Sequence, residues 1–598
     1  MKRCDIDSSY KWDLSSIFKS DEEFYKTYEE INKKMDKYDE YKDLMSSAKR
    51  LLEYMIFDED ISRNFEKIYN YAHMNNDADM SDSKYQEMYG KATYLYSKYL
   101  KCTSFVNPTM LKYDYDKILD YYKEEKELEK YDKVFKEIFR YKKYTLSEAE
   151  EKVLSNLSNV FSNPEDSYSY LTDADMKFGT IKDEEGKDIT LTESNYSIYL
   201  ASKDRTVRES AFKRIMSTYG EFRNSISSLL SGEVEVLTSV AKIRGYNSSM
   251  EASLFNEEID PVVYNTLIDT VSNNLDVLFK YYEAKKNMLK LDELHLYDTY
   301  VNVVEEADKK YTFEEAKDLV IKATSKLGSE YTKILKTAFT DGWIDVYPND
   351  SKRGGAYSGG SYDTKPYVLL NYEGRYNDVS TLAHELGHSM HSYLTRKNNP
   401  YQTGDYKIFV AEVASTVNEL LLAKYMLDNN SDPKVRLSIL SELMGLYKAT
   451  IYRQVMFAEF EKIIHEKKEN GEVLTPDTLC DTYYNLNKKY FGDNVVVDEE
   501  IKNEWMRIPH FYYSFYVYKY AIGLSCASKI VSDIYNGVDG AVDRYINFLS
   551  SGSRKTPLEL LKDTGCDLTK PIVVEEAIHM FSDLLDEFIK TYKEVEGE

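Results

Sequence analysis

The chain has 598 residues, 30% of them charged, and a formal net charge of −25. Its length predicts two or three structural units, and the scarcity of Gly (24) and Pro (11) favours helices over a β-sandwich or barrel. The acidic balance argues against nucleic acid and anionic membranes as partners, because both select basic patches. Five scattered cysteines, no apolar leader and no run of about 18 apolar residues predict a cytoplasmic protein with free thiols.

The N-terminal part, residues 10–150, has the pattern of long charged helices. Ser20 and Glu23 form a capping box at the start of one such helix. Asn107-Pro108 predicts a break between helices. His73 is isolated in this region, and we interpret it as a structural histidine.

Residues 178–192 contain two short β-prone runs on either side of Glu185-Gly186, which predicts a β-hairpin. The helical pattern returns from Asn195 to about Gly245, and again from Pro261 to about Leu291.

Residues 343–372 are rich in Gly, Ser and Tyr and end in an apolar run at 366–372 that predicts a strand. Two interpretations remain open. The segment is either an ordinary loop and strand, or an edge strand with a flexible glycine loop. An edge strand can bind an extended peptide through main-chain hydrogen bonds.

His384-Glu385-Leu386-Gly387-His388 is an H-E-x-x-H pattern on a predicted helix that Asn377, Asp378 or Ser380 could cap. The apolar residues Val379, Leu382, Ala383, Leu386, Met390, Tyr393 and Leu394 follow helical spacing. His384 and His388 lie one turn apart on the other face, where two imidazoles can share one metal ion. The alternative is an amphipathic surface helix. Few charged residues on that face, and a costly mid-helix Gly387, favour the metal site and suggest close approach there.

A catalytic metal site needs a third protein ligand. His391 lies about 10 Å along the helix from His384, too far to share one ion, so we expect it in the second shell or lining the pocket. Residues 409–422 predict a buried helix that Glu412 and Glu419 interrupt, and a metal ion is one of the few adequate partners for a buried carboxylate. Glu412 is preferred as the third ligand, because it follows a loop that could return it to the metal helix, and Glu419 could then orient a histidine ring. The residues alone leave the choice between Glu412 and Glu419 open.

At this point the chain resembles the oligoendopeptidase F branch (M3B) of the M3 zinc metallopeptidases. The matching stretches, in the same order along almost the whole chain, are YKWDLSSIF, FGTIKDEEGKDITLTESNY, RGGAYSGGSYDTKPYVLLNY, HELGHSMHSYL, FVAEVASTVNELLL and IPHFYYSFYVYKYAIG. The resemblance implies one zinc ion per chain, bound by His384, His388 and Glu412, with Glu385 as catalytic base. It implies a mainly α fold, with a multi-helical shell around a deep substrate channel and a small β-sheet next to the HExxH helix.

The resemblance also implies three regions. These are an N-terminal helical region at 1–112, an oligopeptidase F N-terminal-type domain at 113–195, and a catalytic domain at 196–598. The implied substrates are short unstructured peptides, cleaved at internal bonds when Glu385 assists attack by a zinc-bound water.

Residues 508–523 correspond to a family segment that supplies His and Tyr to the active site. The spacing predicts a helix here, with His510, Tyr513, Tyr516 or Val517, and Tyr520 on one face. Aromatic core packing explains most of these tyrosines, and we expect His510, Tyr513 and Tyr520 to contact substrate or the transition state.

Three other functions remain to be tested. The first is a related zinc carboxypeptidase or another metal-dependent amide hydrolase. The second is a catalytically silent peptide-binding scaffold. The third is a structural metal site, which would need a fourth protein ligand. The sequence does not indicate the oligomeric state.

Overall fold

The computed structural model describes residues 2–304 and 309–597, in which helices dominate and strands are few. A mainly α fold with a small sheet beside the H-E-x-x-H helix is therefore confirmed. Contacts divide the chain into two units of three segments each. Unit 1 comprises Met1–Lys143, Lys309–Asn429 and Ile530–Gly565, and unit 2 comprises Tyr144–Asp308, Asn430–Lys529 and Cys566–Glu598. The three sequence regions and the substrate channel stay predictions.

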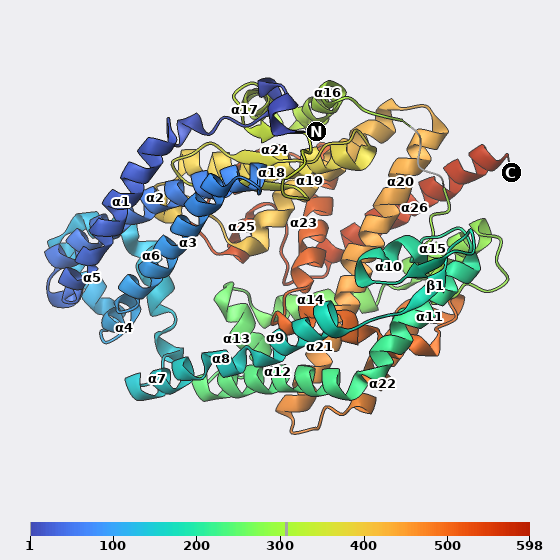
Figure 1. Ribbon diagram of the computed structural model, residues 1–598, viewed down its shortest axis with the longest axis horizontal. Coiled ribbons are helices and arrows are strands. Elements are labelled where there is room, and N and C mark those ends of the chain that lie inside the picture. Colours follow the sequence, from blue (N-terminus) through green and yellow to red (C-terminus); the bar gives the residue numbers. More distant parts are fainter. Residues whose placement is uncertain (1, 305–308, 598) are drawn as a thin grey trace. The chain divides into compact units, whose positions relative to one another are not determined.

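Unit 1 contains six N-terminal helices and a second group around the H-E-x-x-H segment (Figure 1). The first six are α1 (Asp21–Met35), α2 (Ala48–Ala78), α3 (Ser83–Thr103), α4 (Val106–Met110), α5 (Tyr115–Glu124) and α6 (Asp132–Phe139). The others are α16 (Phe313–Thr324), α17 (Ser329–Ala338), α18 (Tyr376–Asn398), α19 (Ile408–Asn429), α24 (Ala541–Leu549) and α25 (Pro557–Asp563). Ser20 caps α1 as predicted, but the Glu23 carboxylate accepts from the Lys19 N–H and so does not complete the capping box. The predicted break at Asn107-Pro108 is wrong, because both residues lie within α4 and the chain leaves the helix earlier, after Thr103.

A three-stranded sheet lies beside α18 in unit 1, with strand order β3 (Ile344–Asp345), β5 (Tyr367–Leu369), β4 (Tyr357–Gly359). β5 pairs in parallel with β3 and antiparallel with β4. The interpretation of the 366–372 run as an edge strand is therefore wrong. Its apolar residues are buried on both faces, as in a central strand, and the preceding Gly- and Ser-rich segment supplies the edge strand β4.

The N-terminal stretch YKWDLSSIF anchors the N-terminal helices to this sheet. Trp12 packs in one apolar core with helices α1 to α6 and with Tyr367 and Leu369 of β5. The Tyr367 hydroxyl donates to the Asp13 carbonyl oxygen at 3.0 Å. The first helices therefore support the sheet that lies beside α18.

Unit 2 is also mainly helical. Its helices are α7 (Glu148–Asn156), α8 (Ser158–Phe161), α9 (Asn163–Ser169), α10 (Glu193–Leu200), α11 (Arg205–Glu221), α12 (Arg223–Arg244), α13 (Ser249–Asn256), α14 (Pro261–Ser272), α15 (Asp276–Met288), α20 (Pro433–Tyr447), α21 (Gln454–Glu469), α22 (Pro476–Phe491) and α26 (Ile572–Glu596). α23 (Tyr518–Tyr535) begins in unit 2 and ends in unit 1. The predicted hairpin is present as β1 (Thr180–Lys182) and β2 (Asp188–Thr190), an antiparallel pair. Among the described residues, no helix has both the length and the apolar character needed to cross a membrane.

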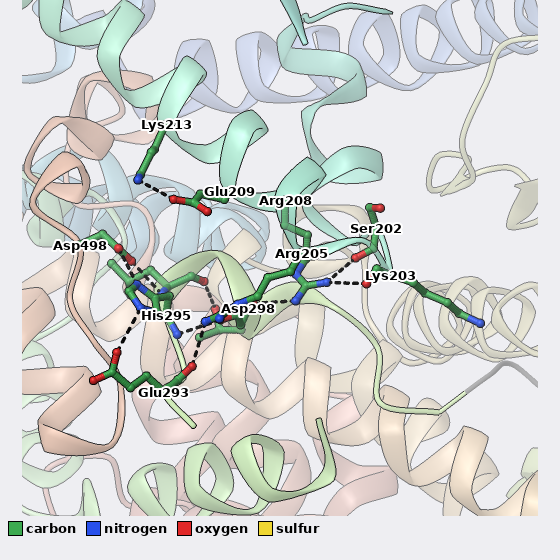
Figure 2. Close-up of polar contacts among 12 residues, drawn as sticks. Ser202, Lys203, Arg205, Arg208, Glu209, Lys213, Glu293, His295, Asp298 and Asp498 are labelled. Atoms are coloured by element: carbon green, nitrogen blue, oxygen red, sulfur yellow. Dashed lines mark hydrogen bonds and ion pairs between the residues drawn. The ribbon is translucent and has the colours of Figure 1, made fainter. Parts of the chain in front are cut away.

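A buried ion-pair cluster joins distant segments of unit 2 (Figure 2). Asp298, from the 3₁₀ helix η9 (Leu296–Tyr300), is fully buried and accepts hydrogen bonds from Arg205 and Arg208 of α11. The His295 side chain lies 2.8 Å from the Asp498 carboxylate in the same region. The Asp298 pairs fix η9 against α11, and the His295–Asp498 pair joins the start of η9 to the chain at residue 498.

Candidate metal centre

α18 begins at Tyr376, earlier than the three proposed caps would place it. Asp378 is the third residue of the helix, and its carboxylate accepts from the backbone N–H groups of Arg375 (2.8 Å) and Glu373 (3.2 Å). A carboxylate at this position can reach back to amides that the helix itself leaves unpaired. Asp378 therefore stabilises the helix start from inside the first turn.

The predicted apolar stripe of α18 is buried, apart from the half-buried Tyr393. The predicted second helix is present as α19, which is mostly buried and lies beside α18 (Figure 1). Close approach at Gly387 was expected near the metal site. The neighbour at Gly387 is in fact the backbone of α19 at Ala414 and Ser415.

His384, His388 and Glu412 come together between α18 and α19. One ligand atom from each lies within 4.8 Å of the other two. The Glu412 Oε2 atom is 3.5 Å from His384 Nε2 and 3.8 Å from His388 Nε2. Ligands bound tetrahedrally at about 2.1 Å from one zinc ion lie about 3.4 Å apart. The donor set and its spacing therefore fit a divalent cation such as zinc.

Groups on α19 hold both imidazole rings. The Glu419 Oε1 atom is 3.4 Å from His384 Nδ1, and the ring of His388 makes a hydrogen bond with the backbone of Ala411. Glu419 thus fixes the Nδ1 side of His384, and the Nε2 atoms of both rings lie near Glu412. This arrangement selects the tautomer that presents Nε2 to a metal.

Two polar residues of α19 that sequence reasoning missed also shape the site. Ser415 Oγ donates to Glu412 Oε2 at 3.1 Å, and Asn418 Nδ2 donates to the Ala383 carbonyl oxygen at 3.1 Å. Tyr331 in turn donates to Asn418 Oδ1 at 3.0 Å. The sequence did contain a signal for both residues. They are small polar residues on an otherwise apolar helix, and buried polar groups need hydrogen-bond partners.

Glu385 is 7% exposed and lies next to the three convergent side chains. Burial is the main cause that raises the pKa of Glu385, to about 7, and the carboxylates of Glu412 and Glu419 raise it further. His384 and a backbone hydrogen bond from Ser358 of β4 act in the opposite direction. A carboxyl group with a pKa near neutrality can both accept and release a proton.

The two histidines differ in protonation because their surroundings differ. Burial lowers the pKa of His384, but the Glu419, Glu385 and Glu412 carboxylates outweigh burial and raise it to about 9. Burial and the neighbouring His384 lower the pKa of His388 to about 4. A metal ion binds neutral imidazole, so it competes with a proton mainly at His384.

His391 does not line a pocket as expected. It is 1% exposed, and its ring stacks on Tyr406 with centroids 3.7 Å apart. Burial lowers its pKa to about 3, so the ring is neutral at physiological pH. His391 therefore packs in the core, because the apolar environment of α18 extends around this part of the helix.

The expected continuous helix over 508–523 is not present. A 3₁₀ turn, η15 (Pro509–Tyr512), is followed by two residues with left-handed backbone, Ser514 (φ 48°) and Phe515 (φ 56°), before α23 begins. This bent path still brings His510 near Tyr513, Tyr516 and Tyr520, with ring centroids 5.6, 6.3 and 6.2 Å away. These residues belong to unit 2, and their contact with substrate stays a prediction.

Comparisons with known proteins assign the family. The profile described as "Peptidase family M3" matches residues 198–580, and the one described as "Oligopeptidase F" matches residues 110–178. The chain is 43% identical to Oligopeptidase PepF of Bacillus subtilis, covering 98% of this chain and 88% of that protein. It is 38% identical to Group B oligopeptidase PepB of Streptococcus agalactiae, with 98% and 97% coverage.

Solved structures agree with this assignment. A putative peptidase from Chlamydophila abortus superposes with a TM-score of 0.92 at 35% identity, over 98% of this chain and 99% of the other. Oligoendopeptidase-F from Enterococcus faecium gives a TM-score of 0.75 at 35% identity, over 97% and 100%. The chain therefore belongs to peptidase family M3, with oligoendopeptidase F proteins among its relatives, and is a metallopeptidase that hydrolyses peptides.

Proposed function

We propose that the protein is a zinc-dependent oligoendopeptidase that cleaves internal bonds of short unstructured peptides. The observation that carries this proposal is the position of Glu385 beside the convergent ligand atoms of His384, His388 and Glu412. We place the enzyme in the cytoplasm, since the cysteines of the described residues are all free thiols.

His384, His388 and Glu412 would hold a divalent ion with net positive charge, and zinc bound there would supply activation of a water and polarisation of the scissile carbonyl. A carboxylate oxygen of Glu385 accepts a proton from the attacking water and then donates it to the leaving nitrogen. His510, Tyr513 and Tyr520 are proposed hydrogen-bond donors to the oxyanion. Burial lowers the pKa of His510, so a neutral N–H is available for that role.

The edge strand β4 is the proposed binding site for the substrate main chain. It pairs with β5 on one side only and contacts Glu385 through Ser358. An extended peptide added to its open side would form backbone hydrogen bonds, which bind many different sequences. The enzyme would therefore select unstructured peptides, because only an extended chain can pair with β4 in this way.

The decisive experiment is Glu385→Gln in the full chain. The variant should bind metal as the wild type does, measured by elemental analysis, and lose about 100- to 10,000-fold of its peptide cleavage rate. Glu330→Gln is the matched control, because this exposed carboxylate pairs with Lys397 of α18 and lies outside the ligand cluster. Cleavage by Glu385→Gln at the wild-type rate would refute the proposed base.

Two further measurements separate the rival functions. Mass analysis of products from defined peptides distinguishes internal cuts from removal of C-terminal residues by a carboxypeptidase. Chelation followed by reloading with zinc, manganese or cobalt identifies the metal that restores cleavage. A protein without bound metal and without chelator-sensitive cleavage would instead be a peptide-binding scaffold.

A further inference from the structure

A cavity of about 220 Å³ lies in unit 2, and its lining includes none of the residues proposed for catalysis. Its walls come from α15, from η9 and the residues that follow it, from α20, from the π-helical turn η12 (Lys448–Arg453), and from α26. Such a cavity has room for several waters or for one small polyatomic ion. π-Helical turns are rare and often occur at functional sites.

Two lysines from different helices meet at this cavity. Lys285 of α15 and Lys448 of η12 both donate to the carbonyl oxygen of Thr299, at 2.8 and 3.0 Å. Because they share one acceptor, the two amines lie within about 6 Å of each other, where like charges repel. Each ammonium has three donors, and this hydrogen bond uses one of them.

Neither amine has a carboxylate partner within ion-pair distance among residues 2–304 and 309–597. The nearby carboxylate of Asp298 is already bound by Arg205 and Arg208, as Figure 2 shows. Arg453, which also lines the cavity, pairs with Glu504 at 2.8 Å. The positive charge of the two lysines is therefore not balanced by the described side chains.

Buried unbalanced charge is unfavourable, and it can be relieved in two ways. Either the amines lose their protons, or an anion joins them. Burial, followed by the repulsion of Lys448, lowers the pKa of Lys285, and burial and Arg453 lower that of Lys448 to about 8. Lys448 thus remains largely protonated at pH 7, which leaves a positive charge for an anion to bind. The cavity also contains the side chains of Asn302 and Ser441, two neutral polar groups that can donate hydrogen bonds.

We propose that this cavity binds a small oxyanion, of the charge and size of phosphate or sulfate, between the amines of Lys285 and Lys448. Charge-assisted hydrogen bonds from two amines, supplemented by neutral donors, are the usual means of binding such anions. A bound oxyanion would connect α15, η12, α20 and the residues that follow η9, and would therefore stabilise unit 2.

The test measures thermal unfolding and equilibrium dialysis of the full chain with inorganic phosphate as the probe. Sulfate, chloride and acetate are compared at constant ionic strength. We expect one phosphate per chain, displaced by sulfate, and a saturable rise in Tm of about 2 °C or more. Chloride and acetate should give smaller shifts.

Two variants test the amines, and a third is the control. Lys448→Met and Lys285→Met should abolish phosphate binding and the rise in Tm. Without phosphate, both should be at least as stable as the wild type, because each removes the repulsion between the two amines. Lys280→Met removes an exposed lysine of the same helix, paired with Asp586, and should respond to phosphate as the wild type does.

Several results would overturn the proposal. One is the absence of bound phosphate. Another is an equal phosphate-induced rise in Tm in the wild type and all three variants. The third is a rise in Tm with chloride or acetate that is as large as the rise with phosphate. Glu305 and Glu306 follow Val304 in the sequence and lie outside the described residues. The wild type could fail to bind phosphate while a Glu305→Gln/Glu306→Gln variant binds it. That result would mean that these two carboxylates, and not a bound anion, balance the charge of Lys285 and Lys448.

Discussion

Gly387 of α18 lies directly against the carbonyl group of Ala414 in α19. A Cβ atom at position 387 would be 2.6 Å from the Ala414 oxygen, closer than real side chains approach backbone. The two helices that supply the metal ligands therefore touch through their backbones at this point. The glycine sits between His384 and His388 in sequence, so the spacing of α18 and α19 sets the distance from both rings to Glu412.

Gly387→Ala should weaken both the fold and the metal site. An added methyl inside a helix gains about 1 kcal/mol in helix propensity, but forcing two backbones apart costs about 1–3 kcal/mol and displaces Glu412 from the histidines. We expect a lower Tm and weaker metal binding, measured by competition with a chelator.

Gly90→Ala is the matched control for this change. Gly90 is an exposed glycine of α3, and nothing lies within 4 Å of a Cβ built on it. This variant should be more stable by up to about 1 kcal/mol with unchanged metal affinity. Equal behaviour of the two variants would contradict the close-contact explanation.

The two carboxylates of α19 should differ in their effect on metal binding. Glu412→Gln removes the charged ligand atom and should abolish stable metal binding. Glu419→Gln keeps an oxygen near His384 Nδ1 but loses its charge, so metal affinity should fall by about 10- to 100-fold. Chelator competition measures both affinities on the same scale.

These two variants also decide the assignment itself. Complete loss of metal from Glu419→Gln would make Glu419 a ligand. Wild-type affinity in Glu412→Gln would remove Glu412 from the site.

Glu461 of α21 should make stability depend on pH. It is fully buried, and its Oε1 atom accepts from the backbone N–H of Phe515 at 2.6 Å. Burial raises its pKa to about 8 from an ordinary 4.5. The folded chain therefore binds this proton more tightly than the unfolded chain. The resulting stability is complete below pH 4.5 and is lost as the pH rises through about 8.

Glu461→Gln keeps an acceptor for Phe515 and cannot ionise. Between pH 5 and 8 the wild type should lose up to about 1.4 kcal/mol per pH unit relative to this variant, so the variant should have the higher Tm at pH 9. Glu466→Gln, an exposed change on the same helix, should keep the wild-type pH profile. If the stability of the wild type and of Glu461→Gln changed with pH in the same way, the Glu461 carboxyl would have no role in the pH dependence.

Asp298 and Glu209 provide a contrast between a buried and an exposed ion pair, both visible in Figure 2. Asp298→Asn leaves the buried Arg208 without its charged partner and should cost about 3–5 kcal/mol. Glu209→Gln breaks an exposed pair with Lys213 on α11 and should change stability by less than about 1 kcal/mol. Urea unfolding measures both, and similar losses would mean that burial does not govern these pairs.

Sequence periodicity was sufficient for the two metal helices, because their apolar residues and their ligands repeat with the helical turn. It could not place Glu412 and Glu419 relative to the histidines, since that depends on how α18 and α19 pack at Gly387 and Ala414. It also failed at 508–523, where Ser514 and Phe515 adopt left-handed backbone that their residue types do not favour. Periodicity also could not predict which strands pair with β5, because its pairing with β3 and β4 depends on the tertiary fold.

The last segment of unit 1 gives the metal helix part of its support. Thr395 Oγ1 and Asn399 Nδ2, at the end of α18, donate to the carbonyl oxygens of Leu549 and Ser550 at 2.9 and 2.8 Å. Translation proceeds from the N-terminus, so these acceptors are made about 150 residues after α18 has left the ribosome's active centre. A nascent chain therefore carries its ligand residues long before α18 is fully packed. Full packing of the helix that carries His384 and His388 therefore waits for the synthesis of Leu549 and Ser550.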